Sequence, residues 1–343
     1  MQLEKKRLFN ENGQRGTQRL IGGNTTNLRE WNRIKYPWAA KLYRTMLNNF
    51  WIPEEVPLTN DAKQFDSLSP AERRAFDKTI SFLNFLDSLQ TENLPNISDY
   101  ITAPEVCSLL NIQTFQEEIH AQSYSYVLDS VCSPQTRESI YDEWRNDERL
   151  LERNKFIADL YQEFVDNPND RSFVKTVIAN YLLESLYFYS GFAFFYTLAR
   201  QGKMTGTATM IKYIQRDELT HVVLFQNMFR ELRTENPDVF TPELIEELRQ
   251  MFHTAATHEI RWGQYVTNNE ILGINNEILE RYIKYLANQR MKALDLEILY
   301  PDHLEHPMKW VDTFANLNQT KTDFFEQKVT NYTKSSGLNL GEL

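Results

Sequence analysis

Residues 173–201 read FVKTVIANYLLESLYFYSGFAFFYTLARQ, which is enough for about eight turns of α-helix. Only Lys175, Glu184 and Arg200 carry charge in this stretch. A helix that is apolar on every side lies in the interior of a protein, because no face of it suits water. The stretch therefore predicts a central buried helix that other helices must surround.

Helical patterns continue on both sides of this stretch. The chain has 343 residues but only 11 Gly and 12 Pro, so few residues interrupt long elements. Ser69 and Pro70 form a typical helix start, with Ser69 as the N-cap. No useful β-alternation competes, and we expect an all-α fold. The expected helices span residues 28–50, 70–90, 104–130, 134–167, 171–201, 206–233, a segment from 242 onward, and 275–297.

Polar segments flank the helical patterns and divide the chain into three parts. We expect an irregular N-terminal arm over residues 1–25, a helical domain over 26–317, and a flexible tail over 318–343. The net charge of −10 leaves no basic footprint for nucleic acid. No signal peptide and no run of 18 apolar residues is present, so we expect a cytoplasmic protein without a membrane span.

Two carboxylates stand in apolar surroundings that do not suit a charge. Glu184 lies in YLLESLYFY, and Asp87 lies in ISFLNFLDSLQ. A buried carboxylate is costly unless it is protonated, paired or bound to a metal. These two positions are therefore candidates for a functional site.

Two Glu-x-x-His pairs add to these acids. Glu117 pairs with His120, and Glu218 with His221. A spacing of three residues places both side chains of a pair on one helix face. Four carboxylates and two imidazoles on four helices form the ligand set of a dinuclear metal site in a bundle. This donor set suits iron or manganese, whereas zinc usually takes four ligands.

With these residues in place, the sequence resembles a known family, the small (R2) subunit of class I ribonucleotide reductase. The resemblance extends from about Trp31 to Tyr332. The matching blocks are NNFWIPEEV (48–56), FLDSLQ (85–90), EEIHAQSY (117–124), LLESLYFYSGF (182–192), YIQRDELTH (213–221) and FFEQKVTNY (324–332). The family implies a ferritin-like helical bundle with a dinuclear metal site in its core.

The resemblance also implies roles for individual residues. Tyr124 matches the tyrosine that carries a stable radical. Trp51 matches the tryptophan on the radical path and Asp217 its hydrogen-bond partner, so that the implied path runs through Trp51, Asp217 and His120 to the metals. Tyr332 matches the tyrosine that relays oxidation to the large subunit. The implied metal ligands are Asp87, Glu117, His120, Glu184, Glu218 and His221. The implied shield of the radical consists of Phe188, Phe192, Ile211 and Ile214.

The family further implies an activity and partners. A metal centre that reacts with dioxygen or a derived oxidant oxidises the tyrosine, and the large subunit uses the oxidising equivalent to reduce ribonucleotides to deoxyribonucleotides. We expect a homodimer, docking of the large subunit through the C-terminal tail, and a flavoprotein activator as a further partner. We expect two iron ions, with di-manganese and manganese–iron centres as alternatives.

Two other functions use similar residues. A ligand-binding oxidase of similar fold would keep the six ligands but would have no use for the FFEQKVTNY tail. A ferritin-like iron-storage bundle would form a hollow cage and would need no shielded tyrosine near the metals.

Overall fold

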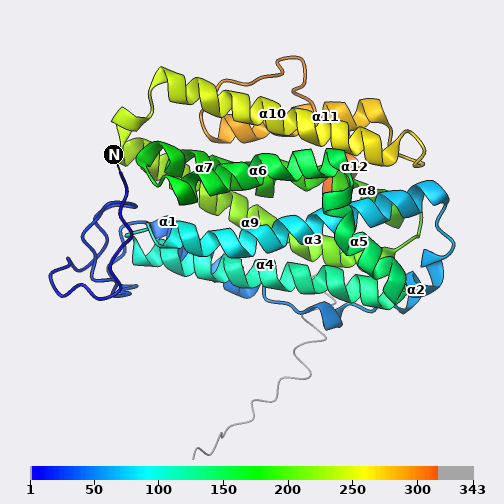
Figure 1. Ribbon diagram of the computed structural model, residues 1–343, viewed down its shortest axis with the longest axis horizontal. Coiled ribbons are helices and arrows are strands. Elements are labelled where there is room, and N and C mark those ends of the chain that lie inside the picture. Colours follow the sequence, from blue (N-terminus) through cyan, green and yellow to red (C-terminus); the bar gives the residue numbers. More distant parts are fainter. Residues whose placement is uncertain (1, 316–343) are drawn as a thin grey trace, which may run out of the picture.

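The computed structural model describes residues 2–315, whose long helices lie side by side in an elongated bundle (Figure 1). In this range the backbone forms helices and a few isolated β-bridges but no sheet. The α-helices are α1 (Pro37–Asn48), α2 (Thr59–Phe65), α3 (Pro70–Ser98), α4 (Pro104–Val131), α5 (Pro134–Asn146), α6 (Glu148–Asp166), α7 (Asp170–Leu182), α8 (Tyr189–Arg200), α9 (Thr205–Glu235), α10 (Pro242–Thr267), α11 (Asn276–Ala293) and α12 (Lys309–Ala315). Shorter elements are the 3₁₀ turns η1 (Pro53–Glu55) and η3 (Pro237–Val239) and the π-helical turn η2 (Leu183–Tyr187).

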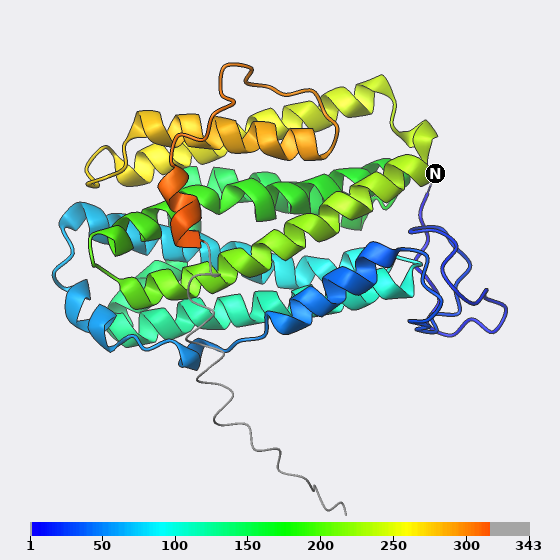
Figure 2. The same cartoon turned by 180° about the vertical axis from the view of Figure 1, so that it is seen from behind.

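The centre of the bundle consists of α3, α4, α9 and the α7–η2 segment. Helix α3 packs along α4, α4 contacts α9, and α9 contacts both α7 and η2. The α10–α11 pair covers α7, η2 and α8 on one side, and α1 lies against α4 and α9 on another (Figure 2). The all-α prediction is confirmed.

The apolar stretch that predicts a central helix is indeed buried, but it is not one regular helix. Asn169 caps α7 through a reciprocal capping box with Ser172. The π-helical turn η2 then interrupts the helical stretch before α8 begins. Every residue from 172 to 198 is buried except Lys175. Glu184 lies within η2, and hydropathy does not reveal this irregularity.

Several helix limits differ from the sequence expectation. The stretch 134–167 is divided into α5 and α6, with Asp147 as the N-cap of α6, and α11 ends at Ala293. The helix expected over 28–50 begins only at Pro37, because the residue before a proline is driven out of the α conformation. Tyr36 accordingly has φ −105° and ψ 92°. Helix α3 continues past 90 to Ser98 although it contains Pro95. Leu94 and Ile97 are fully buried there, and their packing offsets the missing hydrogen bond of the proline.

The segment before α1 is irregular and is tied to the bundle by backbone hydrogen bonds. Leu3 N donates to Pro168 O at 3.0 Å, and Thr102 N donates to Leu20 O at 2.7 Å. The limits of the arm and of the domain stay predictions, and the predicted tail (318–343) lies outside the described residues. Within the described residues no helix is both long and apolar enough to cross a membrane.

Asp61 of α2 supplies the cap that α9 lacks. The residue before α9, Met204, has a left-handed backbone (φ 49°) and makes no side-chain cap. The fully buried Asp61 carboxylate instead accepts hydrogen bonds from Gly206 N (3.0 Å), Thr207 N (2.6 Å) and Thr207 Oγ1 (2.7 Å). A carboxylate at a helix N-terminus satisfies free N–H groups and the helix dipole together.

Asp61→Ala should lower the free energy of unfolding of the metal-free protein by about 1–3 kcal/mol, because it leaves buried donors of α9 without acceptors. Urea unfolding followed by circular dichroism measures this change. Asp66→Ala, at the exposed end of the same short helix, is the control and should leave the midpoint unchanged. Equal midpoints for both variants would contradict the capping role.

Candidate metal centre

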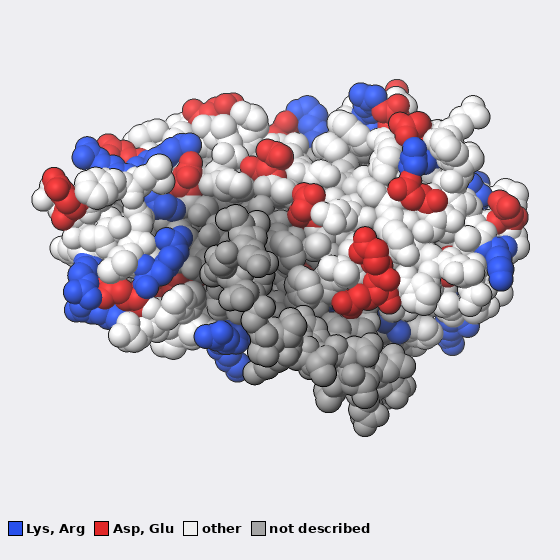
Figure 3. All heavy atoms as spheres, turned by 90° about the horizontal axis from the view of Figure 1, so that it is seen from below, with Lys and Arg blue, Asp and Glu red and all other residues white. Residues whose placement is uncertain are grey.

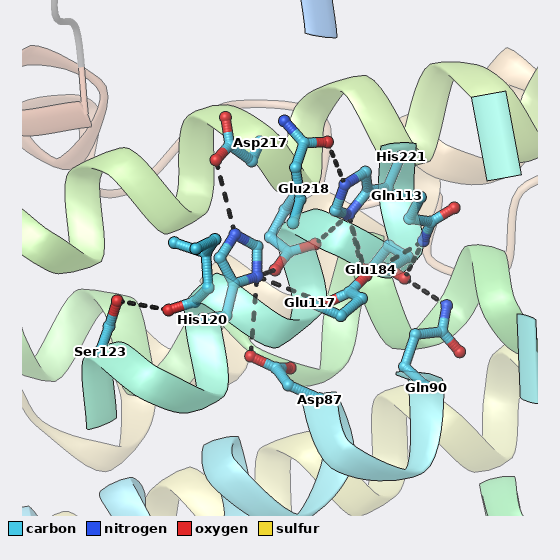
Figure 4. A network of polar contacts seen from close by, with 12 residues as sticks. Asp87, Gln90, Gln113, Glu117, His120, Ser123, Glu184, Asp217, Glu218 and His221 are labelled. Carbon is cyan, nitrogen blue, oxygen red and sulfur yellow. Dashed lines mark hydrogen bonds and ion pairs between the residues drawn. The ribbon is translucent and has the colours of Figure 1, made fainter. Parts of the chain in front are cut away.

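Six side chains from four helical segments converge in the middle of the bundle (Figure 4). All six side chains are fully buried. They are Asp87 of α3, Glu117 and His120 of α4, Glu184 of η2, and Glu218 and His221 of α9. The structure thus brings together the whole predicted ligand set, and its role in binding metal stays a prediction.

The six residues form two overlapping groups. In each group, one ligand atom per residue lies within 4.8 Å of the others. One group contains Asp87 and His120, the other contains Glu184 and His221, and Glu117 and Glu218 belong to both. Two carboxylates shared between two such groups, each with its own imidazole, would suit a pair of cations held close together.

Both histidines turn Nδ1 toward the shared carboxylates. His120 Nδ1 lies 3.1 Å from Glu218 Oε1 and 3.3 Å from Glu117 Oε2. His221 Nδ1 lies 2.8 Å from Glu218 Oε2 and 3.2 Å from Glu117 Oε1. The two ring centroids are 6.0 Å apart. Nδ1 of each ring is therefore the atom that would coordinate a metal.

The other ring nitrogens face oxygen atoms, at hydrogen-bond distance for His221 and at ion-pair distance for His120. Gln116 Oε1 lies 3.0 Å from His221 Nε2, and Asp217 Oδ2 lies 3.5 Å from His120 Nε2. An acceptor at Nε2 keeps the proton there and leaves the Nδ1 lone pair free. The sequence analysis identified Asp217 in this place but did not identify Gln116.

Two more glutamines that the sequence analysis missed hold Glu184. Gln90 Nε2 and Gln113 Nε2 both donate to Glu184 Oε1, the latter at 2.8 Å, and Gln113 also donates to Glu117 Oε1 at 3.1 Å. Glu184 Oε2 has no hydrogen bond and is free to face a cation. The available signal was spacing, since Gln113 precedes Glu117 by one helical turn and Gln90 follows Asp87 by three residues.

The electrostatics of the cluster favour cations. Burial and the charges of Glu117 and Glu218 raise the pKa of Asp87 well above its ordinary value, and burial with the same two charges raises the pKa of Glu184. Burial alone would lower the pKa of His120, but the charge of Glu218 and the contacts with Asp217, Glu117 and Glu218 together outweigh burial, so that the pKa is raised.

The free atoms of the cluster also fit metal ions. Each of the four carboxylates has one oxygen without a hydrogen bond. Four buried carboxylates and two imidazoles fit two divalent ions in charge and in donor type. The residues present therefore fit the dinuclear site that the sequence predicts.

Tyr124 lies next to this cluster. Its hydroxyl donates to Asp87 Oδ2 at 2.8 Å, and its side chain is 1% exposed. Burial, together with the negative charge of Asp87, raises the pKa of Tyr124 well above its ordinary value. The phenol therefore keeps its proton in the resting protein. The four residues of the predicted shield are all buried in the same core: Phe188, Phe192, Ile211 and Ile214.

Trp51 is connected to the cluster through Asp217, on the Nε2 side of the His120 ring. Its indole Nε1 donates to Asp217 Oδ2 at 2.8 Å, the same oxygen that faces His120 Nε2. Arg216 Nε donates to the other Asp217 oxygen at 3.1 Å. Trp51, Asp217 and His120 thus form a continuous polar chain. Tyr332, the remaining predicted residue, lies outside the described residues.

Comparison with known proteins gives a consistent result. The family model described as the small chain of ribonucleotide reductase matches residues 28–307. A ribonucleoside-diphosphate reductase subunit beta from Treponema pallidum is 49% identical over 340 residues, which cover 98% of this chain and 97% of the relative. The corresponding subunit from Halalkalibacterium halodurans is 42% identical and covers 98% of both chains.

A solved structure is similar over nearly the same range. The ribonucleotide reductase R2 subunit from Clostridium botulinum has 66% sequence identity and a TM-score of 0.91, and the match covers 92% of this chain and 100% of that one. Sequence, fold and the buried cluster point the same way. The chain belongs to the family of ribonucleotide reductase small chains.

Proposed function

We propose that this chain is the radical-generating small subunit of a class I ribonucleoside-diphosphate reductase, which reduces ribonucleotides together with a large subunit. The observation that carries the proposal is a buried cluster of four carboxylates and two imidazoles with a phenol hydrogen-bonded to one of its carboxylates. Neither an iron store nor a purely structural bundle needs that phenol, and family membership also argues against storage.

The proposed ligands for two transition-metal ions are the six residues of the cluster. Oxygen and imidazole donors suit iron and manganese. We propose a di-iron centre, with di-manganese and manganese–iron as the alternatives. When bound, the metals would supply the oxidising power, while the protein supplies geometry and a dry environment.

Tyr124 is the proposed site of the radical. Oxidation of a phenol releases its proton, and Asp87 Oδ2, at 2.8 Å, is the acceptor next to it. The position of this carboxylate means that the proton has only one hydrogen bond to cross. Burial of Tyr124 keeps water and reductants away from the ring.

The proposed exit path runs from His120 through Asp217 to Trp51, and then through Tyr332 to the large subunit. Asp217 Oδ2 lies between His120 and Trp51, since it accepts a hydrogen bond from Trp51 Nε1 and faces His120 Nε2. The tail beyond Tyr332 ends in apolar Leu338, Leu340 and Leu343, which we propose dock on the large subunit.

The remaining partners follow from the family. Small subunits of this family work with a large subunit and generally as dimers, and we propose a homodimer here. We also propose a flavoprotein activator and a cytoplasmic location. On the face seen in Figure 3, acidic and basic side chains are interspersed, so this face offers no uniform basic surface to nucleic acid.

Removing the amide that connects two ligands tests the metal site. Gln113→Leu should weaken metal binding roughly 10- to 100-fold, because Glu184 and Glu117 both lose a donor. Titration with Mn²⁺ followed by electron paramagnetic resonance measures the affinity. Gln122→Leu, on the exposed side of α4, should bind as the parent does. Equal affinities for both variants would argue against this arrangement.

Tyr124→Phe tests the radical. The variant should bind two metals as the parent does but show no tyrosyl signal by electron paramagnetic resonance after oxidation, and nucleotide reduction with the large subunit should be abolished. Tyr126→Phe, two residues along α4 and only partly buried, is the control and should keep the signal. Full activity of Tyr124→Phe would remove this tyrosine from the mechanism.

Trp51→Phe and Tyr332→Phe test the path. Each variant should form the Tyr124 radical yet lose turnover, because an oxidisable side chain between the radical and the large subunit is missing. Trp38→Phe is a matched control, since Trp38 Nε1 also donates to a carboxylate of α9, Glu231, at 3.0 Å. Turnover at the parental rate in either path variant would exclude that residue from the path.

A further inference from the structure

The π-helical turn η2 is the one irregular support among the segments that carry the six clustered residues. It spans Leu183–Tyr187 and contains Glu184, whereas the other five residues lie on regular α-helices. A π-turn breaks the ordinary hydrogen-bond register, so that carbonyl groups near it lose their usual backbone donors. The position of Glu184 therefore depends on what holds this turn.

Two arginines from outside the turn donate to its carbonyl oxygens. Arg290 of α11 donates from Nε to Ser185 O at 3.2 Å, and Arg153 of α6 donates from Nη2 to Tyr187 O. These carbonyls come one and three residues after Glu184. Arg153 is 2% exposed, so its contact with the turn is shielded from water.

Arg153 is itself held on three sides. Its Nη2 donates to Glu259 Oε2 of α10 at 2.6 Å. Its guanidinium carbon lies 4.4 Å from the ring centroid of Phe82 and 4.3 Å from that of Tyr187. A guanidinium that contacts two aromatic rings and a carboxylate has little freedom to rotate.

Glu259 extends the contact to the start of α8. Its Oε1 accepts from Ser190 N at 2.9 Å and from Ser190 Oγ. One helical turn further along α10 stands Gly263, where an added Cβ would lie 3.1 Å from Ser190 Cβ. The absence of a side chain at Gly263 lets α10 approach closely enough for Glu259 to reach the backbone of Ser190.

We propose that Arg153, Glu259, Ser190 and Arg290, here called the π-turn clamp, position Glu184 for metal binding. They are positioning residues, since none of them belongs to the six-residue cluster. Only one of the two overlapping groups contains Glu184. Loss of the clamp should therefore lower the affinity for the metal ion next to Glu184 and His221. The affinity for the ion next to Asp87 and His120 should stay the same.

Stability alone does not account for this arrangement. A buried ion pair must overcome the desolvation of both charges and is often no more stabilising than apolar side chains of the same size. Here Arg153 donates to the carbonyl oxygen of Tyr187 in the turn, and Glu259 accepts from the backbone N–H of Ser190 just after the turn. This geometry is that of a support for irregular backbone.

The test uses the full-length protein and variants that keep the buried charge balanced. Ser190→Ala removes one hydrogen bond, and the double variant Arg153→Met with Glu259→Gln removes both charges, so that no single buried charge prevents folding. The control is Arg171→Gln, which breaks the exposed Arg171–Glu247 ion pair between α7 and α10. The inference rests on the proposed metal-binding function, and two measurements separate the two ideas.

The first measurement is hydrogen exchange of the metal-free protein. Peptides that cover residues 183–192 should exchange faster in the double variant, while peptides that cover α4 and α9 should keep the parental rates. The second measurement is titration with Mn²⁺ alone. One of the two bound ions should bind roughly 10- to 100-fold more weakly, which is the usual effect of losing a group that orients a ligand. The control variant should match the parent in both.

Other outcomes would contradict either the π-turn clamp or the proposed metal-binding function. Parental exchange over 183–192, or equal weakening of both Mn²⁺ ions with faster exchange throughout, would overturn the clamp. If the parent itself bound no Mn²⁺, the proposed function would fail, and the exchange measurement would still show whether the clamp supports the turn.

Discussion

Four carboxylates buried in an apolar bundle are the main constraint on the stability of this fold. Burial raises the pKa of Asp87 and Glu184, and each carboxylate of the cluster has an oxygen without a hydrogen bond. Without cations such a core is destabilising, because like charges repel strongly where water is excluded. Two divalent ions held by the same groups, as proposed, would instead link the four helical segments to one another. Metal binding at this cluster would therefore be coupled to the stability of the bundle.

The six clustered residues could be predicted from the sequence because charged residues in apolar helices are conspicuous. Glu184 stands alone among aromatic residues, and two Glu-x-x-His pairs share a spacing that helix geometry translates directly into position. Trp51 and Asp217 came from the family resemblance, and the structure joins them by a hydrogen bond of 2.8 Å. All-α architecture also followed from pattern alone, since few residues interrupt the helices.

Other features could not be predicted, because they depend on contacts between segments far apart in the chain. Gln113 reads as an ordinary polar residue until α3, α4 and η2 come together around Glu184. The turn η2 is invisible to hydropathy, since a π-helical and an α-helical residue look equally apolar. Arg153 meets Glu259 across 106 residues of sequence, and no local pattern indicates their contact.

Helix α9 carries Asp217, which accepts a hydrogen bond from Trp51, and also Glu218 and His221, which belong to the buried cluster. An α-helix turns about 100° with each residue. Inserting one residue between Tyr213 and His221 would therefore rotate the residues before the insertion by about 100° relative to those after it. The connection between α10 and α11 carries none of the six clustered residues, so a change in its length would leave their spacing along α9 intact. The function proposed for this chain thus requires a fixed length of the nine residues from 213 to 221.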